Sequence, residues 1–306
     1  MITSISDIQV YKRCRRRWNY SSSLRMNLTP IGLGKPSLEL GTLVHAALAD
    51  WQIAHFEGNP KSLHYYFAMR ADERITEVEK KYLATNGMNI SPEELDPLVK
   101  SVELGLAMMA NYEKKWKKPL PNRFKYAVTE QEIVVAIPGT EHHLRVILDG
   151  LLYDQHDVVS ILERKTYDRR PNVKNLENND QFTGYLWAAR EAELGRIGGI
   201  AYDGMWKRAV PPRGNTFDDL FLRMPIYIGH DQLDEWGRQL ADTVNEMASN
   251  PSLYKNRRWE GCDDCSFETL CNAESRDEDT KHLIDNFFTL REDKKPRNIV
   301  GIDVSK

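Results

Sequence analysis

The spacing of apolar side chains in the first 120 residues predicts helices. Ile8 and Tyr11 recur at close to the helical period and indicate a first helix that begins near Ser6. The pair Ser91-Pro92 is a helix-start signal, because serine caps a first turn and proline suits its first position. Further helices are expected over residues 38–56, 62–85 and 92–117.

The middle of the chain changes to stretches in which apolar and polar residues partly alternate, as they do in strands. These stretches are rich in valine, isoleucine, leucine and tyrosine. Strands are expected over residues 124–137, 143–154, 157–163, 197–207 and 219–228. Helices are expected over residues 180–194 and 231–249, an irregular stretch over 250–275 and an amphipathic segment over 282–290.

The order of these elements predicts an α/β (α+β) protein with a central mixed sheet flanked by helices. The chain has 306 residues, and we expect one domain over residues 1–306. Four parts are expected within it: a helical N-terminal region over about 1–120, a sheet core over about 121–250, a cysteine element over about 251–275 and a tail over 276–306.

Composition and charge narrow the class of protein. The chain is 41% hydrophobic and 28% charged, and its net charge of −3 excludes a bulk polycation. We see no secretory leader and no run of the ~20 apolar residues that span a bilayer, so we expect a cytoplasmic protein without a membrane partner. Any nucleic-acid surface must be a local basic cluster. Such clusters lie around Cys14, before Cys262 and at 164–174, where Arg169 and Arg170 are candidates for phosphate contacts.

The four cysteines are unevenly placed. Cys14 stands alone near the start, and Cys262, Cys265 and Cys271 lie close together much later in a C-x2-C-x5-C pattern. Four thiolates can hold one iron–sulfur cluster or one tetrahedral zinc ion, so a metal centre here would join the two ends of the chain. The cysteines could instead be buried small apolar side chains, or include a disulfide pair.

Two strands of the predicted sheet carry acidic residues. Asp149 interrupts one apolar strand, and Glu163 ends the next, with Lys165 two residues later. Alternate residues of a strand share a face, so Glu163 and Lys165 point together, and antiparallel pairing would bring Asp149 against Glu163. Adjacent carboxylates are typical of a divalent-cation site, where the lysine would place positive charge beside a phosphate. An exposed strand end with a Glu–Lys pair is the alternative interpretation.

Each of two predicted helices carries a pair of candidate site residues that are one turn apart. Gly41 would leave room for a close approach beside His45, whose imidazole could bind the same cation. Gln181 and Tyr185 share a face of the later helix and could contact a phosphate, a base or the lysine. Each pair could equally be part of an ordinary core or surface.

Taken in this order, the motifs resemble the RecB-type nucleases of the PD-(D/E)XK superfamily. Within it they resemble the iron–sulfur branch, which includes the AddB nuclease domain and the CRISPR spacer-acquisition exonucleases. The resemblance spans residues 4 to about 272 and implies a restriction-endonuclease-like core with an iron–sulfur-stapled C-terminal element. It is carried by the cysteines and by Gly41-x3-His45, Asp149, Glu163-x-Lys165-Thr166 and Gln181-x3-Tyr185.

The resemblance implies a role for each motif. A catalytic Mg²⁺ or Mn²⁺ would be bound by three side chains and one main-chain carbonyl, those of His45, Asp149 and Glu163 and that of Arg164. Lys165 would orient and activate the attacking water. Gln181 and Tyr185 would position DNA and support the active centre. Cys14, Cys262, Cys265 and Cys271 would hold a structural [4Fe-4S] cluster, with zinc as the alternative occupant.

The chain departs from the family pattern at two positions. Val146 stands where the motif before the first acid has glycine, and Glu163 stands where the RecB branch commonly has aspartate. The first departure leaves Asp154 as an alternative to Asp149. Asp149 is preferred, because Asp154 lies only nine residues before Glu163 and would leave a very short hairpin.

The expected activity is that of a metal-dependent DNA exonuclease acting from single-stranded ends. It would serve DNA recombination, repair, replication, or phage or CRISPR DNA processing. The chain lacks a G-x4-G-K-[ST] phosphate loop, so any motor would be a separate helicase or another recombination or adaptation protein. The alternative function is a DNA-end-binding or scaffolding module with a vestigial nuclease centre.

Overall fold

The computed structural model describes residues 1–31, 36–119, 124–256, 262–263 and 265–291. Its α-helices are α1 (Ile5–Arg13), α2 (Arg15–Ser21), α3 (Pro36–Phe56), α4 (Leu63–Asn86), α5 (Pro92–Trp116), α6 (Asp180–Glu191), α7 (His230–Ala248), α9 (Glu268–Ser275) and α10 (Thr280–Phe287). Its strands are β1 (Ile2–Ser4), β2 (Leu28–Pro30), β3 (Phe124–Ala136), β4 (His143–Asp154), β5 (Val158–Tyr167), β6 (Arg196–Trp206), β7 (Phe221–Ile226) and β8 (Phe288–Leu290). Short 3-10 helices lie at Val173–Asn178 and Phe217–Leu220.

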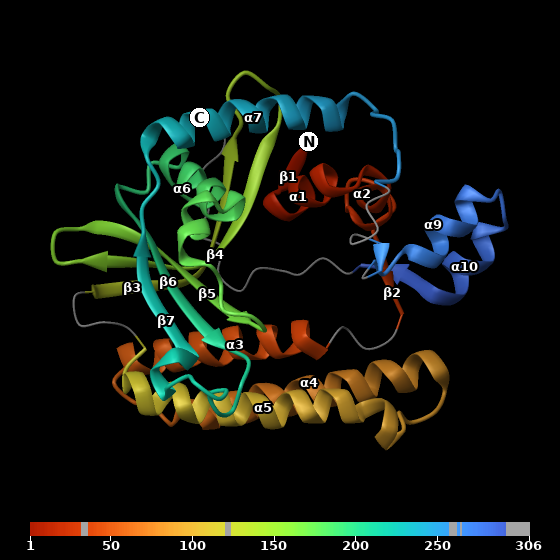
Figure 1. The fold of residues 1–306 in the computed structure, drawn as a ribbon. Coiled ribbons are helices and arrows are strands. Elements are labelled where there is room, and N and C mark those ends of the chain that lie inside the picture. Colours follow the sequence, from red (N-terminus) through yellow and green to blue (C-terminus); the bar gives the residue numbers. More distant parts are fainter. Residues whose placement is uncertain (32–35, 120–123, 257–261, 264, 292–306) are drawn as a thin grey trace.

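The central sheet has the strand order β1-β4-β5-β6-β7, and β3 also pairs with β4. Strands β4 and β5 are antiparallel, β5 and β6 are parallel, and β6 and β7 are antiparallel. Helix α6 supplies the crossover that the parallel pair β5–β6 requires. With helices on either side of the sheet (Figure 1), these pairings confirm the predicted mixed α/β architecture.

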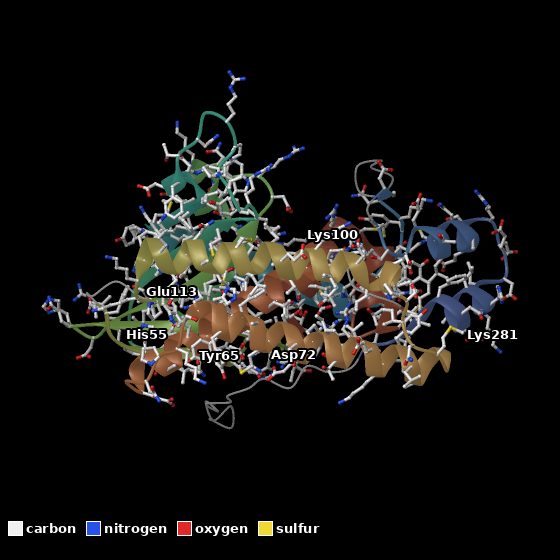
Figure 2. All side chains as sticks on the ribbon, turned by 90° about the horizontal axis from the view of Figure 1, so that it is seen from below. His55, Tyr65, Asp72, Lys100, Glu113 and Lys281 are labelled. Atoms are coloured by element: carbon white, nitrogen blue, oxygen red, sulfur yellow. The ribbon has the colours of Figure 1, made fainter. Side chains whose placement is uncertain are left out.

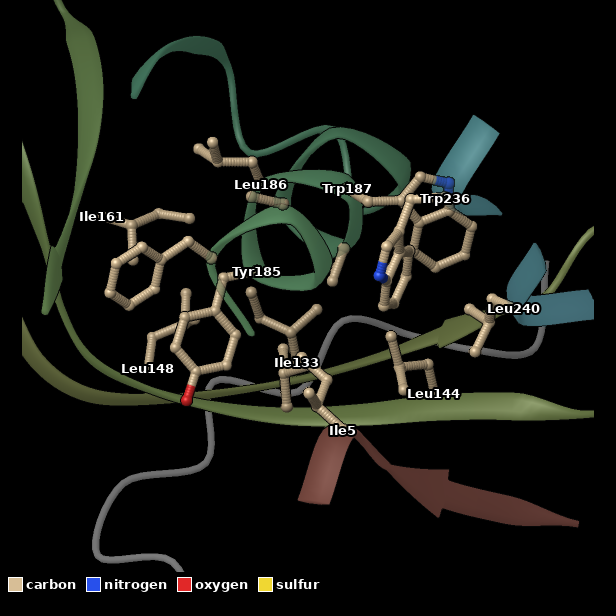
Figure 3. Packing of buried hydrophobic residues seen from close by; sticks show 14 of the residues in the cluster. Ile5, Ile133, Leu144, Leu148, Ile161, Tyr185, Leu186, Trp187, Trp236 and Leu240 are labelled. Atoms are coloured by element: carbon tan, nitrogen blue, oxygen red, sulfur yellow. The ribbon is translucent and has the colours of Figure 1, made fainter. Parts of the chain in front are cut away.

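Two apolar cores lie on the two sides of the sheet. On one side, alternate residues of β3, β4 and β5 pack against α1, α6 and α7 (Figure 3), with Trp187 and Trp236 at the centre of the helical contact. On the other side, α3 and α5 pack on the sheet through residues such as Trp51, Met109 and Met205. The inner strand β6 contributes to both cores, through Ile200 and Tyr202 on one side and Met205 on the other.

Helices α3, α4 and α5 form the lower layer of the molecule, seen from below in Figure 2. Helix α5 begins with the predicted serine cap, since Ser91 Oγ accepts from the main-chain N–H of Glu94 at 3.2 Å. Arg70 of α4 forms an ion pair with Asp50 of α3. No helix in the described part of the chain is long and apolar enough to cross a membrane.

The remaining elements differ from the sequence expectation. Strand β1 pairs with β4, and β2 pairs with β8. In both pairs the two strands are far apart in the sequence. Such three-residue strands have no periodicity of their own, so only their distant partners define them. Helix α9 lies within the stretch expected to be irregular, where Leu270 is buried against Tyr20 and Leu28 of the N-terminal segment. The expected amphipathic segment is helical in α10 and continues as β8.

Candidate active site

Strands β4 and β5 bring the two candidate acidic residues together. In this antiparallel pair Gly150 lies opposite Leu162, and just beyond this pairing the main-chain N–H of Arg164 donates to Asp149, so Asp149 lies beside the residue that follows Glu163. A Cβ atom at Gly150 would lie 2.5 Å from the main-chain oxygen of Val128 on β3, which explains why glycine suits this position. The two acids therefore meet where three strands pass close to one another.

Both carboxylate oxygens of Asp149 have partners. The main-chain N–H of Arg164 donates to Oδ2 at 2.7 Å, and Nδ1 of His45 lies 3.2 Å from Oδ1. His45 comes from α3, where a Cβ atom at Gly41, one turn earlier, would lie 3.4 Å from Oγ1 of Thr166 on β5. The close approach of helix and strand at Gly41 thus brings His45 to Asp149.

Glu163 and Lys165 point to the same side of β5. Nζ of Lys165 lies 2.6 Å from Oε1 of Glu163 and donates to Oε1 of Gln181 at 3.1 Å. Nε2 of Gln181 in turn donates to the hydroxyl of Tyr185 at 2.6 Å. The ring of Tyr185 lies in the core, and its hydroxyl points to the edge of that core (Figure 3). These contacts join the acidic centre to α6.

Asp154, the alternative acid, forms part of the turn between β4 and β5. Its Oδ1 accepts from the main-chain N–H groups of His156 and Val158, at 2.8 and 3.0 Å. An aspartate commonly stabilises a turn in this way. Asp154 thus lies at the closed end of the hairpin, whereas Glu163 lies at the other end of the same strand pair.

The neighbouring charges shift the pKa of each group in the centre. Burial opposes the charge on Asp149, but His45 and the Arg164 N–H outweigh it and lower the pKa of Asp149 to about 2. Burial and the charge of Asp149 raise the pKa of Glu163 to about 7, against the effect of Lys165. Burial also disfavours charge on His45, yet Asp149 and Glu163 raise its pKa. An ionised carboxylate therefore lies beside a second carboxylate whose ionisation is disfavoured.

The donor set of this centre suits a hard divalent cation. Carboxylate oxygens and an imidazole are ligands that such ions accept. Oε1 of Glu163 is buried, and the ammonium group of Lys165 contacts it at 2.6 Å. In the described part of the chain, no group of three or more His, Cys, Asp or Glu side chains is arranged around a single metal ion. At this centre, His45 and Lys165 contact the two carboxylates.

The fold divides the basic cluster at residues 164–174. The guanidinium of Arg164 is buried, so its side chain is not part of a surface patch, contrary to the sequence expectation. Arg170 is exposed and forms an ion pair with Asp219 at 2.7 Å. Arg169 and Lys174 are exposed as well, and their exposure suits a contact with a phosphate.

All four cysteines line one pocket of about 390 Å³. Cys14 lies at the junction of α1 and α2, and the other three come from α9 and the residues before it. The four are free thiols, so no disulfide joins them. Burial raises the pKa of the Cys271 thiol, against the hydrogen bond and charge of Arg16. The pocket is also lined by the basic residues Lys12, Arg13, Arg17 and Lys255.

Hydrogen bonds between protein groups hold the two sides of this pocket together. Arg16 of α2 donates to the hydroxyl of Ser275 at 2.8 Å, and Asn256 donates to the main-chain oxygen of Arg13 at 2.8 Å. The basic residues Arg257 and Arg258, which belong to the expected cluster before Cys262, lie outside the described residues. The described contacts are sufficient to place the N-terminal segment beside α9.

Sequence patterns did not identify a buried polar group beneath the acidic centre. The guanidinium of Arg164 donates to Oε1 of Gln52, and Asp203 on the next strand accepts from Arg223 at 2.9 Å. The signal in the sequence is the position of Gln52, seven residues after His45 and therefore on the same face of the helix. Asp203 gives no such signal, because it lies within an otherwise ordinary apolar strand.

Comparisons with known proteins assign this chain to a family. Among solved structures, "Crystal structure of SSO0001" is 16% identical and has a TM-score of 0.38, with 89% of this chain and 86% of that chain covered. "Crystal structure of protein VC1899 from Vibrio cholerae" is 14% identical with a TM-score of 0.22, and 74% of this chain and 60% of that chain are covered. No curated protein matches this chain. Both TM-scores are below 0.5, so the assignment rests on the family model that matches residues 2–272. By that match, the chain belongs to the PD-(D/E)XK nuclease superfamily.

Proposed function

We propose that this protein is a metal-dependent DNA exonuclease that hydrolyses phosphodiester bonds from single-stranded ends. Membership of the superfamily indicates a nuclease and hence a nucleic-acid substrate. The observation that carries the proposal is that His45, Asp149, Glu163 and Lys165 meet between α3, β4 and β5. A module that only binds DNA ends would not need this set of groups.

The cation in this proposal is Mg²⁺ or Mn²⁺, which supplies positive charge at the phosphate undergoing attack. Its ligands would be His45, Asp149, Glu163 and the main-chain carbonyl of Arg164. The chemistry of the donor set, two carboxylates and one imidazole brought together between α3, β4 and β5, supports this assignment. The low pKa of Asp149 keeps one ligand ionised over the whole physiological range.

Lys165 is the second source of positive charge in the proposed centre. If a divalent cation bound Glu163, the ammonium group of Lys165 would be free to orient the attacking water and to stabilise charge on the phosphate. Its hydrogen bond to Gln181 limits how far it can move, and Tyr185 holds Gln181 in turn. These two residues therefore support Lys165 as well as facing the DNA.

The exposed arginines would contact the DNA backbone beside this centre. Arg169 is exposed and would contact one phosphate. Arg170 would contact a phosphate in place of its present ion-pair partner, Asp219. Such contacts add affinity without reading the base sequence. We therefore propose a substrate preference that depends on the strand end rather than on sequence.

For the cysteine pocket, we propose a [4Fe-4S] cluster that joins the two ends of the chain. All four cysteines line one pocket of about 390 Å³, which leaves room for a cluster larger than a single ion. Basic residues around the pocket would offset the negative charge of the thiolates.

Digestion of end-labelled DNA tests the nuclease proposal. Wild-type protein with Mn²⁺ should shorten single-stranded DNA progressively from one end, and EDTA or the Glu163→Gln variant should abolish the shortening. Protein that binds DNA ends but leaves them intact with either Mg²⁺ or Mn²⁺ would instead support the vestigial module. Anaerobic purification tests the cluster separately: a brown protein is expected, and a colourless protein with one zinc per chain would contradict it.

A further inference from the structure

The main-chain N–H and the side chain of Arg164 donate hydrogen bonds to two different partners. Its N–H donates to Asp149 at 2.7 Å, whereas its side chain extends to the face of β5 that α3 covers. There the guanidinium donates to Oε1 of Gln52 at 2.5 Å. Arg164 is 1% exposed and Gln52 is 0% exposed, so this hydrogen bond is shielded from water.

Gln52 and His45 lie on the same face of α3. They are seven residues apart, which is two turns or about 10 Å along the helix axis. His45 contacts Asp149 on β4, and Gln52 contacts Arg164 on β5. Because the N–H of Arg164 also donates to Asp149, the four residues form a closed ring of contacts. This ring joins one helix to both strands of the acidic centre.

The ring contains buried polar atoms that are not fully paired. Among the described residues, Nε of Arg164 and Nε2 of Gln52 have no hydrogen-bond partner. Asp203, the neighbour of Arg164 on β6, accepts hydrogen bonds through one oxygen, while its buried Oδ1 accepts none from a described residue. Buried charges with incomplete pairing stabilise a fold less well than apolar side chains of the same size. Stability alone therefore does not account for this arrangement.

We propose that Gln52 and the guanidinium of Arg164 are positioning residues for the divalent-cation site. By drawing α3 and β5 together, their hydrogen bond sets how closely His45 approaches Asp149. It also holds the N–H of Arg164 against the same carboxylate, which fixes the orientation of Asp149. The inference rests on the proposed function, since the cation is the one that His45, Asp149 and Glu163 would bind.

An ion pair elsewhere on α3 offers a matched control. Arg70 of α4 donates to both carboxylate oxygens of Asp50, at 2.6 and 2.8 Å. Asp50 lies two residues before Gln52 on the same helix, but its ion pair fastens α3 to α4 rather than to the sheet. Loss of Arg70 therefore shows what loosening α3 by itself does to the cation site.

Calorimetric titration with Mn²⁺ in the absence of DNA measures the effect on the site directly. Gln52→Leu should raise the dissociation constant for Mn²⁺ by roughly 10- to 100-fold, as is typical when a residue that orients metal ligands is lost. Gln52→Glu should keep the wild-type affinity, because a carboxylate oxygen accepts the same hydrogen bond from Arg164. Arg70→Met should lower the melting temperature but leave the Mn²⁺ affinity unchanged.

The outcomes separate this inference from the proposed function. Equal Mn²⁺ affinities in Gln52→Leu and Arg70→Met would overturn the positioning role and leave the nuclease proposal standing. Wild-type protein that neither binds Mn²⁺ nor cleaves DNA would overturn the nuclease proposal itself. If Gln52→Leu does not fold, Gln52→Asn is measured in its place. Asparagine keeps the amide, but its side chain is one methylene shorter, so its oxygen no longer reaches Arg164. An unchanged affinity in Gln52→Asn would also overturn the positioning role.

Discussion

The titration of Glu163 should make cation binding by this protein depend on pH. Burial and the adjacent charge of Asp149 raise the pKa of Glu163 to about 7, and the carboxylates beside His45 raise its pKa as well. A divalent cation binds a carboxylate after the proton has left, and it binds an imidazole only in the neutral form. We therefore expect the affinity for Mn²⁺ to increase between pH 6 and pH 8.

The size of this increase follows from the pKa of Glu163. With a pKa of about 7, Glu163 is about 10% ionised at pH 6 and about 90% ionised at pH 8. Affinity should therefore rise roughly tenfold through Glu163 alone, and deprotonation of His45 adds to this rise. Asp149 contributes no change, because its pKa of about 2 keeps it ionised throughout.

In the absence of added cation, the free energy of unfolding should decrease as the pH rises, whereas the affinity for Mn²⁺ increases. The pKa of Glu163 in the folded protein lies above its ordinary value of 4.5, so the folded state binds more protons than the unfolded state between about pH 4.5 and 7. The free energy of unfolding therefore falls as pH rises through this window. His45, whose pKa is also raised, extends the fall above its ordinary value of 6.5. Added Mn²⁺ should restore stability, and more so at pH 8 than at pH 6.

Two measurements check this reasoning. Calorimetric titration with Mn²⁺ at pH 6, 7 and 8 gives the affinities, and thermal unfolding with and without Mn²⁺ gives the stabilities. Glu163→Gln is the matched variant, because its amide has nearly the same volume and does not titrate, so its weaker affinity should vary less with pH. Equal affinities of the wild-type protein at pH 6 and pH 8 would refute the argument, since Glu163 would then be ionised throughout or would not bind the cation.

Three further substitutions test separate assignments. Lys165→Ala should slow single-turnover cleavage on the order of 100- to 1,000-fold without weakening DNA binding, because its charge acts on the transition state; unchanged cleavage would remove Lys165 from the mechanism. Cys14→Ala should abolish the visible absorbance of anaerobically purified protein and lower its melting temperature, because the proposed cluster would no longer link the N-terminal helices to the C-terminal cysteines. Asp154→Ala should cost roughly 1–2 kcal/mol of stability in chemical denaturation through two lost turn hydrogen bonds. A loss of Mn²⁺ affinity in that variant would identify Asp154, not Asp149, as the ligand.

The sequence by itself determined the relations between residues that are close along the chain. Alternation in β5 placed Glu163 and Lys165 on one face, and their side chains are in contact at 2.6 Å. The four-residue spacing of Gln181 and Tyr185 likewise placed them on one helix face, where they share a hydrogen bond. These relations follow from the geometry of a single strand or helix, so the local pattern is sufficient to predict them.

Only the tertiary structure decided which distant residues meet. Asp149 lies beside β5 because Gly150 pairs with Leu162 and the N–H of Arg164 donates to the Asp149 carboxylate, and a shift of this register by one residue would remove that contact. Arg164 belongs to a basic run in the sequence, yet helix α3 covers its side of β5 and makes its guanidinium an internal group. Its partner Gln52 lies 112 residues away. Contacts of this kind depend on the path of the whole chain and on which faces of the sheet are covered, and no local pattern of residues records either.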